Sequence, residues 1–576
     1  MAQAAGIGRL PARSALYRHR GILIQYALAL LTAVLVIAPI LPVVFQSFLE
    51  GPLYDPAWHL TLANYGELFT SPLLGELLWN SLLFSIGTTL IAQVIGAASA
   101  ILVGRTDIPF RGPLGDMLMW PLFVSHLVLG FGWFLVYGPS GYGTLLFERV
   151  TGIEDPWSLY TISGMAVVAG VSQAPLAFLY CLSATTAADP SLEDAARISG
   201  AGPMRTLWKV TIPLIKPAIL FSAILNFTIA LEMLAIPLLF GRPSGIQLFT
   251  TYLYVEGILA PRPNYGLVGT AAVLLLLIVT GLVWLQGRML RESGRFVTVR
   301  GKAVRPRQFK LERWKWPLFA LLILYVLVAV LVPIGGLLMR AVTSFVTPFI
   351  PPWQLLTLEH VEMIFAYPAF RRSIVNTILI AAIGGLVATA FVVALALITH
   401  RSEFRFRRAL EFLALYPRAV PGIIVGIGFF YAAILLPPMG WLRNTIWILI
   451  IAYTMRYIPT GFGAIVPGLL QLDRDLDRSA RTVGADWWTT GRSILVSLLK
   501  PAMFSCYALL FIHFFKEYVA AVFLFAPGSE VIGTTMLTFW IQGDTGPVSA
   551  LAIVQVVITV LFVYLARKAL GAKIYG

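Results

Sequence analysis

Seven ionisable side chains stand out within long apolar stretches of this sequence: Glu232, Arg418, Arg456, Lys516, Glu517, His126 and His513. An ionisable group buried in apolar surroundings is costly and is therefore a candidate for function. Glu232 and Glu517 could line a pathway as a pair of carboxylates that attracts a cation. Alternatively, both carboxylates brace the fold by bonding to neighbouring helix termini or to Arg418, Arg456 or Lys516.

The residue patterns of other common chemistries are missing from the sequence. It contains no H-E-x-x-H and no clustered histidines, and Cys181 and Cys506 lie singly in apolar runs. The phosphate-binding loop of an ATPase needs G-x-x-x-x-G-K-[ST], but the one Gly-Lys pair, Gly301-Lys302, is followed by Ala303. We therefore predict no catalytic residues, no metal site and no cofactor in this chain.

Two polar loops carry a second group of candidate residues. In the first loop they are Glu193, Asp194, Ala195, Ala196, Arg197 and Gly200, and in the second loop they are Asp477, Arg478, Ala480, Arg481 and Gly484. Ser191 can cap a short helix that Gly200 ends with a left-handed turn, and Asp486 can cap the next helix in the second copy. Each loop is therefore predicted to form a helix–turn–helix. A plain connection between spans is the alternative, but two copies in register argue against it.

The two loops belong to an internal repeat. Asn80, Arg105, Pro121, Gly130 and Gly132 recur 296 positions later as Asn376, Arg401, Pro417, Gly426 and Gly428; Arg197, Gly200 and Lys216 recur 284 positions later as Arg481, Gly484 and Lys500. Shared hydrophobicity alone would not place matching Arg, Pro and Gly at constant offsets. The chain is therefore predicted to be two copies of one unit.

The composition identifies the elements that must position these residues. Hydrophobic residues make up 58% of the 576 residues and charged residues only 12%, which is about half the charged share of a soluble protein. Windows of about 20 apolar residues predict about twelve transmembrane helices, including 115–137, 216–241, 409–435 and 501–526. The expected fold is an all-α polytopic membrane protein of two six-helix parallel repeats related by a twofold axis along the membrane normal.

The charges set the predicted orientation and domain limits. Most of the 42 Lys and Arg fall in alternate connections, which by the positive-inside rule places both termini in the cytoplasm. We predict a cytoplasmic N-terminal segment at 1–20, two six-span domains at 21–290 and 317–570, and a basic cytoplasmic linker at 291–316. The two loops, 188–215 and 469–500, are then cytoplasmic.

These loops resemble the E-A-A loop of the membrane subunits of bacterial binding-protein-dependent ABC importers: Glu-Ala-Ala, three residues, Gly, nine residues, then Ile-x-Leu-Pro. The first copy matches as Asp194-Ala195-Ala196, Gly200 and Val210-Thr211-Ile212-Pro213. The second matches as Arg478-Ser479-Ala480, Gly484 and Ile494-Leu495-Val496-Ser497. It departs from the pattern at Arg478, which follows Asp477, and at Ser497. We therefore expect either that the two loops dock differently or that the second loop docks more weakly.

The resemblance covers almost the whole chain, and the fusion of two domains is similar to ferric-iron permeases and to thiamine and 2-aminoethylphosphonate permeases. It implies a type I ABC importer permease fold in a bacterial inner membrane. It also implies two copies of a cytoplasmic ABC ATPase that bind ATP and Mg²⁺, and a periplasmic or lipid-anchored solute-binding protein. Membrane lipids are also expected as partners, and nucleic acid is not.

The substrate and one other class of protein stay open at this point. Ferric iron is the first choice of substrate because of the fused architecture, with 2-aminoethylphosphonate, thiamine or a polyamine as alternatives. A secondary active transporter can also have two parallel six-helix halves. It should need no ATPase, and the twin loops argue against it.

Overall fold

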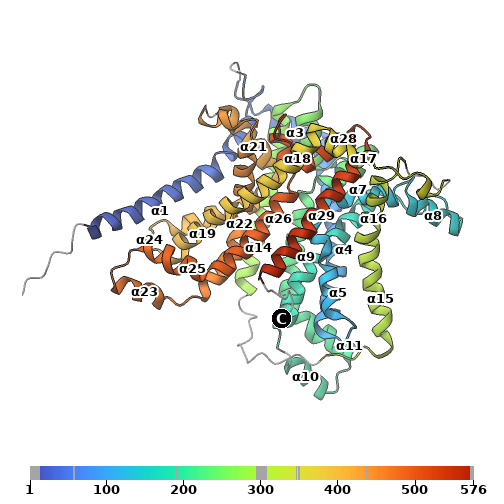
Figure 1. Ribbon diagram of the computed structural model, residues 1–576, viewed down its shortest axis with the longest axis horizontal. Helices are drawn as coiled ribbons and strands as arrows, with labels where there is room; N and C mark the ends of the chain where they lie inside the picture. The colour runs from blue at the N-terminus through green and yellow to red at the C-terminus, as the bar shows by residue number, and fades with distance from the viewer. Residues whose placement is uncertain are drawn as a thin grey trace, which may run out of the picture.

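The computed structural model describes residues 13–293 and 308–570, apart from residues 56, 58, 190, 346, 348, 349 and 436. The described part of the chain is built from helices (Figure 1), as the composition predicts. The predicted N-terminal segment lies partly outside it, and Arg13 to Arg20 already belong to the first helix. Most of the predicted linker, from 294 to 307, also lies outside it.

The first half contains long helices joined by short ones. Its α-helices are α1 (Arg13–Ile37), α2 (Ile40–Gln46), α3 (Ala63–Thr70), α4 (Pro72–Arg105), α5 (Arg111–Leu118), α6 (Trp120–Phe123), α7 (His126–Tyr137), α8 (Tyr142–Thr151), α9 (Ile162–Ala187), α10 (Ser191–Ile198), α11 (Pro203–Thr206), α12 (Ile212–Leu231), α13 (Phe249–Tyr254) and α14 (Tyr265–Ser293). Short π-helical and 3₁₀ turns at Leu207–Thr211, Pro237–Gly241, Arg242–Ser244 and Val255–Leu259 connect some of them.

The second half repeats this order. Its α-helices are α15 (Lys315–Val326), α16 (Val332–Ala341), α17 (Glu359–Ala366), α18 (Pro368–Leu379), α19 (Gly385–Arg401), α20 (Arg407–Leu415), α21 (Gly422–Leu435), α22 (Ile446–Gln471), α23 (Asp475–Thr482), α24 (Trp487–Thr490), α25 (Val496–Leu498), α26 (Lys500–Lys516), α27 (Ala521–Leu524), α28 (Ile532–Ile541) and α29 (Thr545–Leu570). The π-helical turns Leu327–Leu331, Ile380–Gly384 and Gly491–Leu495 and the 3₁₀ turns Glu312–Trp314, Pro352–Gln354, Tyr416–Ala419 and Pro437–Leu442 complete it.

The number of membrane-crossing helices agrees with the predicted fold class. Within the described residues, nine helices are long and apolar enough to cross a bilayer, and three bent pairs raise the number to as many as twelve. The third predicted segment of each half is not a straight helix, because its two parts meet at 98° in the first half and at 110° in the second. In the first half α6 ends at Phe123, and Ser125 caps α7 through a bond from the Val128 amide, 3.2 Å long.

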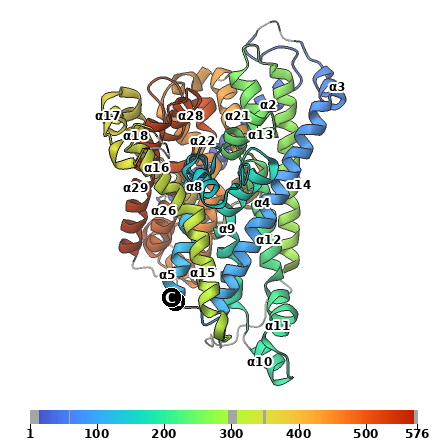
Figure 2. The same ribbon diagram turned by 90° about the vertical axis from the view of Figure 1, so that its right-hand side faces the viewer.

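The first helix of each half packs on the other half. The Tyr26 ring of α1 contacts Phe404, which leads into α20, with 5.1 Å between ring centroids. In the second half, Tyr325 of α15 donates to the Val171 carbonyl of α9 over 3.0 Å, and Figure 2 shows α15 against α5. Each half thus packs its first helix, α1 or α15, against the opposite half.

Two glycines of the repeat permit a close approach between the backbones of the two halves. A Cβ at Gly132 would lie 2.7 Å from the Pro333 carbonyl oxygen, and one at Gly428 would lie 2.1 Å from that of Pro39. Small residues let helix backbones approach in membranes. The repeated glycines therefore mark where the bent third segments pass the first helix of the opposite half.

Candidate functional site

The first loop has the predicted helix–turn–helix conformation. Gly200 follows α10 with a φ of +82°, and Pro203 begins α11. The helix start differs from the prediction, because Ser191 is already helical and its amide donates to the Asp189 carboxylate over 2.9 Å. That bond holds the pKa of Asp189 below its usual value.

The carboxylate of Glu193 fixes α10 to the rest of the first half. Glu193 is only 2% exposed. Its Oε1 accepts from the Thr211 hydroxyl over 2.8 Å and lies 3.6 Å from Nε of Arg105, the last residue of α4. Asp194, the acidic residue of the E-A-A match, instead lies half exposed beside Arg197, with a separation of 3.8 Å.

The second loop repeats this arrangement with different residues. Asp477 of α23 lies 2.8 Å from Nη1 of Arg401, the last residue of α19. Gly484 has a φ of +85°, and Asp486 caps α24 through a 3.0 Å bond from the Thr489 amide, as predicted. In each half, the acidic residue that pairs with the arginine at the end of the long helix therefore lies one residue before the first position of the E-A-A match. Arg478 occupies that first position in the second loop and so does not replace the pairing acid.

The equivalent arginines Arg197 and Arg481 have different partners. Arg197 lies over the Phe309 ring, 4.1 Å from its centroid, and Phe309 belongs to the segment that leads into the second half. Arg481 lies 3.0 Å from Glu403, just after α19. The two loops are therefore unequal in their surroundings.

Both loops present apolar side chains to solvent at the same end of the molecule. Ile198 at the end of α10 is 88% exposed and Val483 after α23 is 84% exposed. Figure 1 shows α10 and α23 apart from each other, at the end away from α3, α17 and α28. The two helix–turn–helix loops therefore lie at one end of the molecule (Figure 1).

The apolar-segment candidates partly meet at the centre of the molecule. Arg456 of α22 lies between the carboxylates of the two halves, with its Nη2 3.7 Å from Glu232 and its Nε 3.3 Å from Glu517. Tyr457 donates a short hydrogen bond to Glu517. A single guanidinium therefore pairs with both carboxylates, as the bracing alternative expects.

Glu232 and Glu517 do not lie inside continuous helices as predicted. Each residue directly follows the fifth long helix of its half, at the ends of α12 and α26. The helices can stop there because side chains and neighbouring backbone replace their hydrogen bonds. Glu232 accepts from the Gly422 amide of the opposite half over 3.3 Å, and Glu517 accepts from the Ala520 amide over 3.1 Å.

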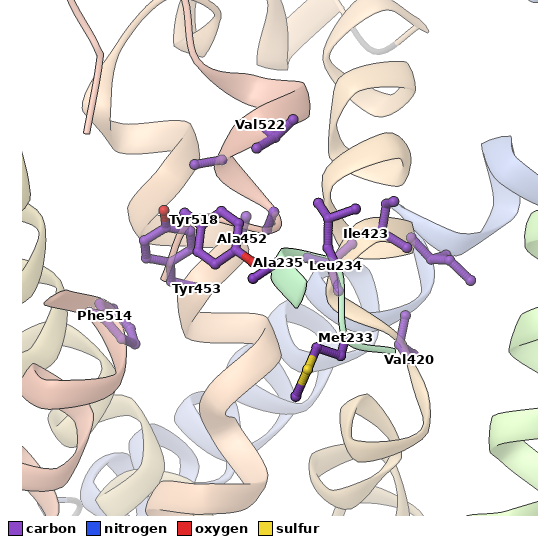
Figure 3. Packing of buried hydrophobic residues seen from close by; sticks show 14 of the residues in the cluster. Met233, Leu234, Ala235, Val420, Ile423, Ala452, Tyr453, Phe514, Tyr518 and Val522 are labelled. Carbon is purple, nitrogen blue, oxygen red and sulfur yellow. The ribbon is translucent and has the colours of Figure 1, made fainter. Parts of the chain in front are cut away.

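Two other candidates lie apart from this pairing. Lys516 donates over 2.8 Å to the Leu122 carbonyl, close to the bend in the first half. Arg418 lies over the Phe221 ring, 5.7 Å from its centroid. Apolar packing surrounds the cluster, and Figure 3 shows Leu234 and Ala235 of the first half between Ile423 and Tyr518 of the second.

Three residues of these sites, Arg105, Arg401 and Tyr457, had no role predicted from the sequence. In the sequence, Arg105 and Arg401 stand out only as a pair of repeated arginines. Their shared charge at a constant offset was the signal that could have pointed to a role. Tyr457 carried no signal, because an aromatic residue in an apolar helix is ordinary.

The comparison with known families decides the class of protein. Residues 116–290 and 393–574 match the family model described as the binding-protein-dependent transport system inner membrane component. These two copies cover more than half of the chain and contain the two loops. The chain belongs to this family. It is therefore a multi-pass membrane permease of a bacterial ABC importer and not itself an ATPase, which decides against the secondary transporter.

Individual relatives are distant but match over most of the permease. It is 26% identical over 547 residues to the ferric transport system permease protein FbpB of Actinobacillus pleuropneumoniae, covering 92% of this chain and 76% of that protein. It is 24% identical over 489 residues to the Fe(3+)-transport system permease protein FbpB 2 of Haemophilus influenzae, covering 84% and 87%. A solved bacterial ABC transporter involved in alginate import aligns with 46% of the permease and 98% of its own chain, at 18% identity and a TM-score of 0.37.

Proposed function

We propose that this permease forms the complete translocation pathway of an ATP-driven importer, with ferric iron as its substrate. The observation that carries the proposal is the pair of similar helix–turn–helix loops at one end of a duplicated pore. Two such loops in one chain match two ATPase subunits. A solute-binding protein would deliver the substrate at the opposite end.

The orientation follows from the same proposal. The ATPases work in the cytoplasm, so α10 and α23 lie on the cytoplasmic side, together with both termini. The basic linker would then face the anionic cytoplasmic leaflet. ATP and Mg²⁺ bind to the ATPase subunits. Closure of these subunits would move α10 and α23, which we call the coupling helices.

The central cluster, which consists of Glu232, Arg456 and Glu517, would hold the pathway between the halves closed. Glu232 comes from the first half, while Arg456 and Glu517 come from the second, so separation of the halves must break at least one ion pair. In water-poor surroundings such pairs are strong only while their geometry is kept. Movement of the coupling helices would exchange these contacts, with Lys516 and Arg418 as the neighbouring cations along the pathway.

Ferric iron is supported by two observations. Two relatives that match over most of the chain are described as ferric-iron permeases, and two carboxylates at the interface of the halves suit a cationic substrate. The experiment is uptake into proteoliposomes that contain the permease, its ATPase and its binding protein, with labelled Fe³⁺. ATP-dependent uptake of 2-aminoethylphosphonate, thiamine or a polyamine in place of iron would overturn this substrate.

Docking of the ATPase is tested at the turns of the two loops. Gly200 has a positive φ that a β-branched residue does not tolerate, so Gly200→Val should distort the turn and reduce copurification of the ATPase by about tenfold, which corresponds to a loss of about 1.4 kcal/mol of binding free energy. Gly202→Val is the matched control, because Gly202 has a φ of −66° and equally open surroundings. Equal ATPase recovery from both variants and full transport would contradict the docking assignment.

A further inference from the structure

Arg105 and Arg401 are buried at the same point of each half, although both are charged. Arg105 ends α4 and is 1% exposed, and Arg401 ends α19 and is 8% exposed. A buried guanidinium is strongly destabilising unless it is paired and hydrogen-bonded. The partners of these two arginines therefore indicate which role the buried side chains have.

Arg105 connects three elements of the first half. Its Nη2 donates to the Ala188 carbonyl at the end of α9 over 2.9 Å, and its Nε faces the carboxylate of Glu193 on α10. Glu193 in turn accepts from Thr211, at the end of the turn that leads into α12. One side chain thus joins the ends of α4 and α9 to the coupling helix.

Arg401 makes the same three connections in the second half. Its Nη2 donates to the Leu469 carbonyl at the end of α22 over 2.7 Å and to the Leu472 carbonyl, and its Nη1 pairs with Asp477 of α23. The repetition is independent of sequence identity, because one half uses glutamate and the other aspartate.

The helices that the arginines join are closely packed pairs. A Cβ at Gly96 of α4 would lie 2.5 Å from Ala177 of α9, and one at Gly461 of α22 would lie 3.1 Å from Val392 of α19. Contacts this close leave little room for one helix to slide along the other. Each pair is therefore a stiff body that runs from the coupling end through the apolar part of the molecule.

We propose that Arg105 and Arg401 are positioning residues, which fasten each coupling helix to a stiff helix pair so that the three helices move together. The inference rests on the proposed function of the loops. A coupling helix that moved alone would leave a buried guanidinium and a carboxylate unpaired, which is costly. Movement imposed on α10 or α23 is consequently passed to α4 and α9 or to α19 and α22.

The test separates coupling from assembly in the complete complex of permease, ATPase and binding protein. Asp477→Asn removes the charge with almost no change of volume, and Glu193→Gln does the same in the first half. We expect each variant to retain bound ATPase but to transport about tenfold less solute per ATP hydrolysed, a typical loss for a coupling free energy. Asp477→Glu and Glu193→Asp keep the charge and should recover most of the transport per ATP.

A double-mutant cycle controls for damage to the fold. Because Arg401 and Asp477 act as one pair, Arg401→Gln combined with Asp477→Asn should lower transport per ATP no further than the worse single variant. Arg408→Gln, which removes an exposed charge from the neighbouring α20, should leave it unchanged. Normal transport per ATP in the neutral variants, or losses that simply add in the double variant, would overturn the inference.

Assays of the wild-type complex distinguish a failure of this inference from a failure of the proposed function. If the wild-type permease neither binds the ATPase nor transports, the proposed function itself fails. If it does both, and the neutral variants of Glu193 and Asp477 still transport normally for each ATP hydrolysed, only the role of the two arginines fails.

Discussion

At the scale of single residues, the central cluster is unusual because one cation serves two anions. Arg456 has no counterpart in the first half, where the equivalent position 284 residues earlier is Ser172. Both Glu232 and Glu517 therefore depend on the same guanidinium, which also lies against the backbone at Gly422, where a Cβ would be 1.1 Å from its Nη1.

Loss of this guanidinium should destabilise the permease strongly. Arg456→Gln leaves two carboxylates without their cation, and removal of one partner of a buried pair costs about 3–5 kcal/mol. We expect a lowered Tm in detergent. The triple variant with Glu232→Gln and Glu517→Gln should recover part of the loss, since no buried charge is then left unpaired. A single variant as stable as the wild type would contradict the pairing.

The positions of these charged residues were only partly predictable. The sequence shows which charges are buried, since an ionisable residue in an apolar run stands out. It does not show that Glu193, and not Asp194, is the buried acid, because both fit a short helix and the choice depends on where Arg105 lies after folding. Partners far apart in the chain are set by packing, which the spacing of residues does not record.

At the scale of elements, the pairing of α4 with α9 depends on small residues at their contact. Gly96→Ala places a Cβ 2.5 Å from Ala177 and 2.6 Å from the Ala174 carbonyl oxygen. Overpacking of this kind costs about 1–3 kcal/mol, so the Tm should fall. Gly75→Ala, on an exposed face of the same helix with nothing within 4 Å, should instead leave the Tm unchanged or raise it slightly, since alanine favours a helix by about 1 kcal/mol. A similar Tm for both variants would contradict this packing.

Residues 309–315, which we call the strap, connect the start of the second half to the end of α4. The Phe309 amide donates to the Arg105 carbonyl over 2.8 Å, and the Leu311 amide donates to the Asp107 carboxylate over 2.9 Å. Lys315 lies 3.5 Å from the same carboxylate. The Leu311 bond, aided by Lys315, lowers the pKa of Asp107 below its usual value.

The strap should therefore depend on pH in a defined direction. A lowered pKa means that ionised Asp107 stabilises the folded state above its unfolded pKa of about 4 and that this contribution is lost as the pH falls through the folded pKa. Asp107→Asn should lower the Tm modestly at pH 6, and the difference from the wild type should shrink towards pH 3. A difference that stays constant over this range would show that the charge has no part in the strap.

The elements themselves were more predictable than their shape. Apolar windows located the spans, but a window average does not detect the break at Val124–Ser125 or at Val420–Pro421, where only two residues leave the helix. The turns at Gly200 and Gly484 were predictable, because the left-handed conformation selects a specific residue type. Bends in an apolar segment have no such signature beyond prolines, which also occur in the unbroken α9.

At the scale of the whole molecule, the exchange of first helices predicts that the covalent linker is dispensable for assembly. Chains cut between residues 300 and 301 and expressed together should copurify in detergent, because α1 packs on the second half and α15 on the first. A second fragment that begins at residue 342, and so lacks α15 and α16, should not associate. Failure of the full-length fragments to copurify would contradict the interlocked arrangement.

The strap also bears on the ATPases that the permease is proposed to bind. Through Phe309 and Arg197 it gives α10 a neighbour that α23 does not have, since Arg481 contacts Glu403 instead. Two chemically identical ATPase subunits would cease to be equivalent once seated on this chain. Their spectra, their cross-links and the order in which they hydrolyse nucleotide should then differ within a single complex, and this duplicated membrane protein would impose a first and a second position on a homodimer that has none of its own.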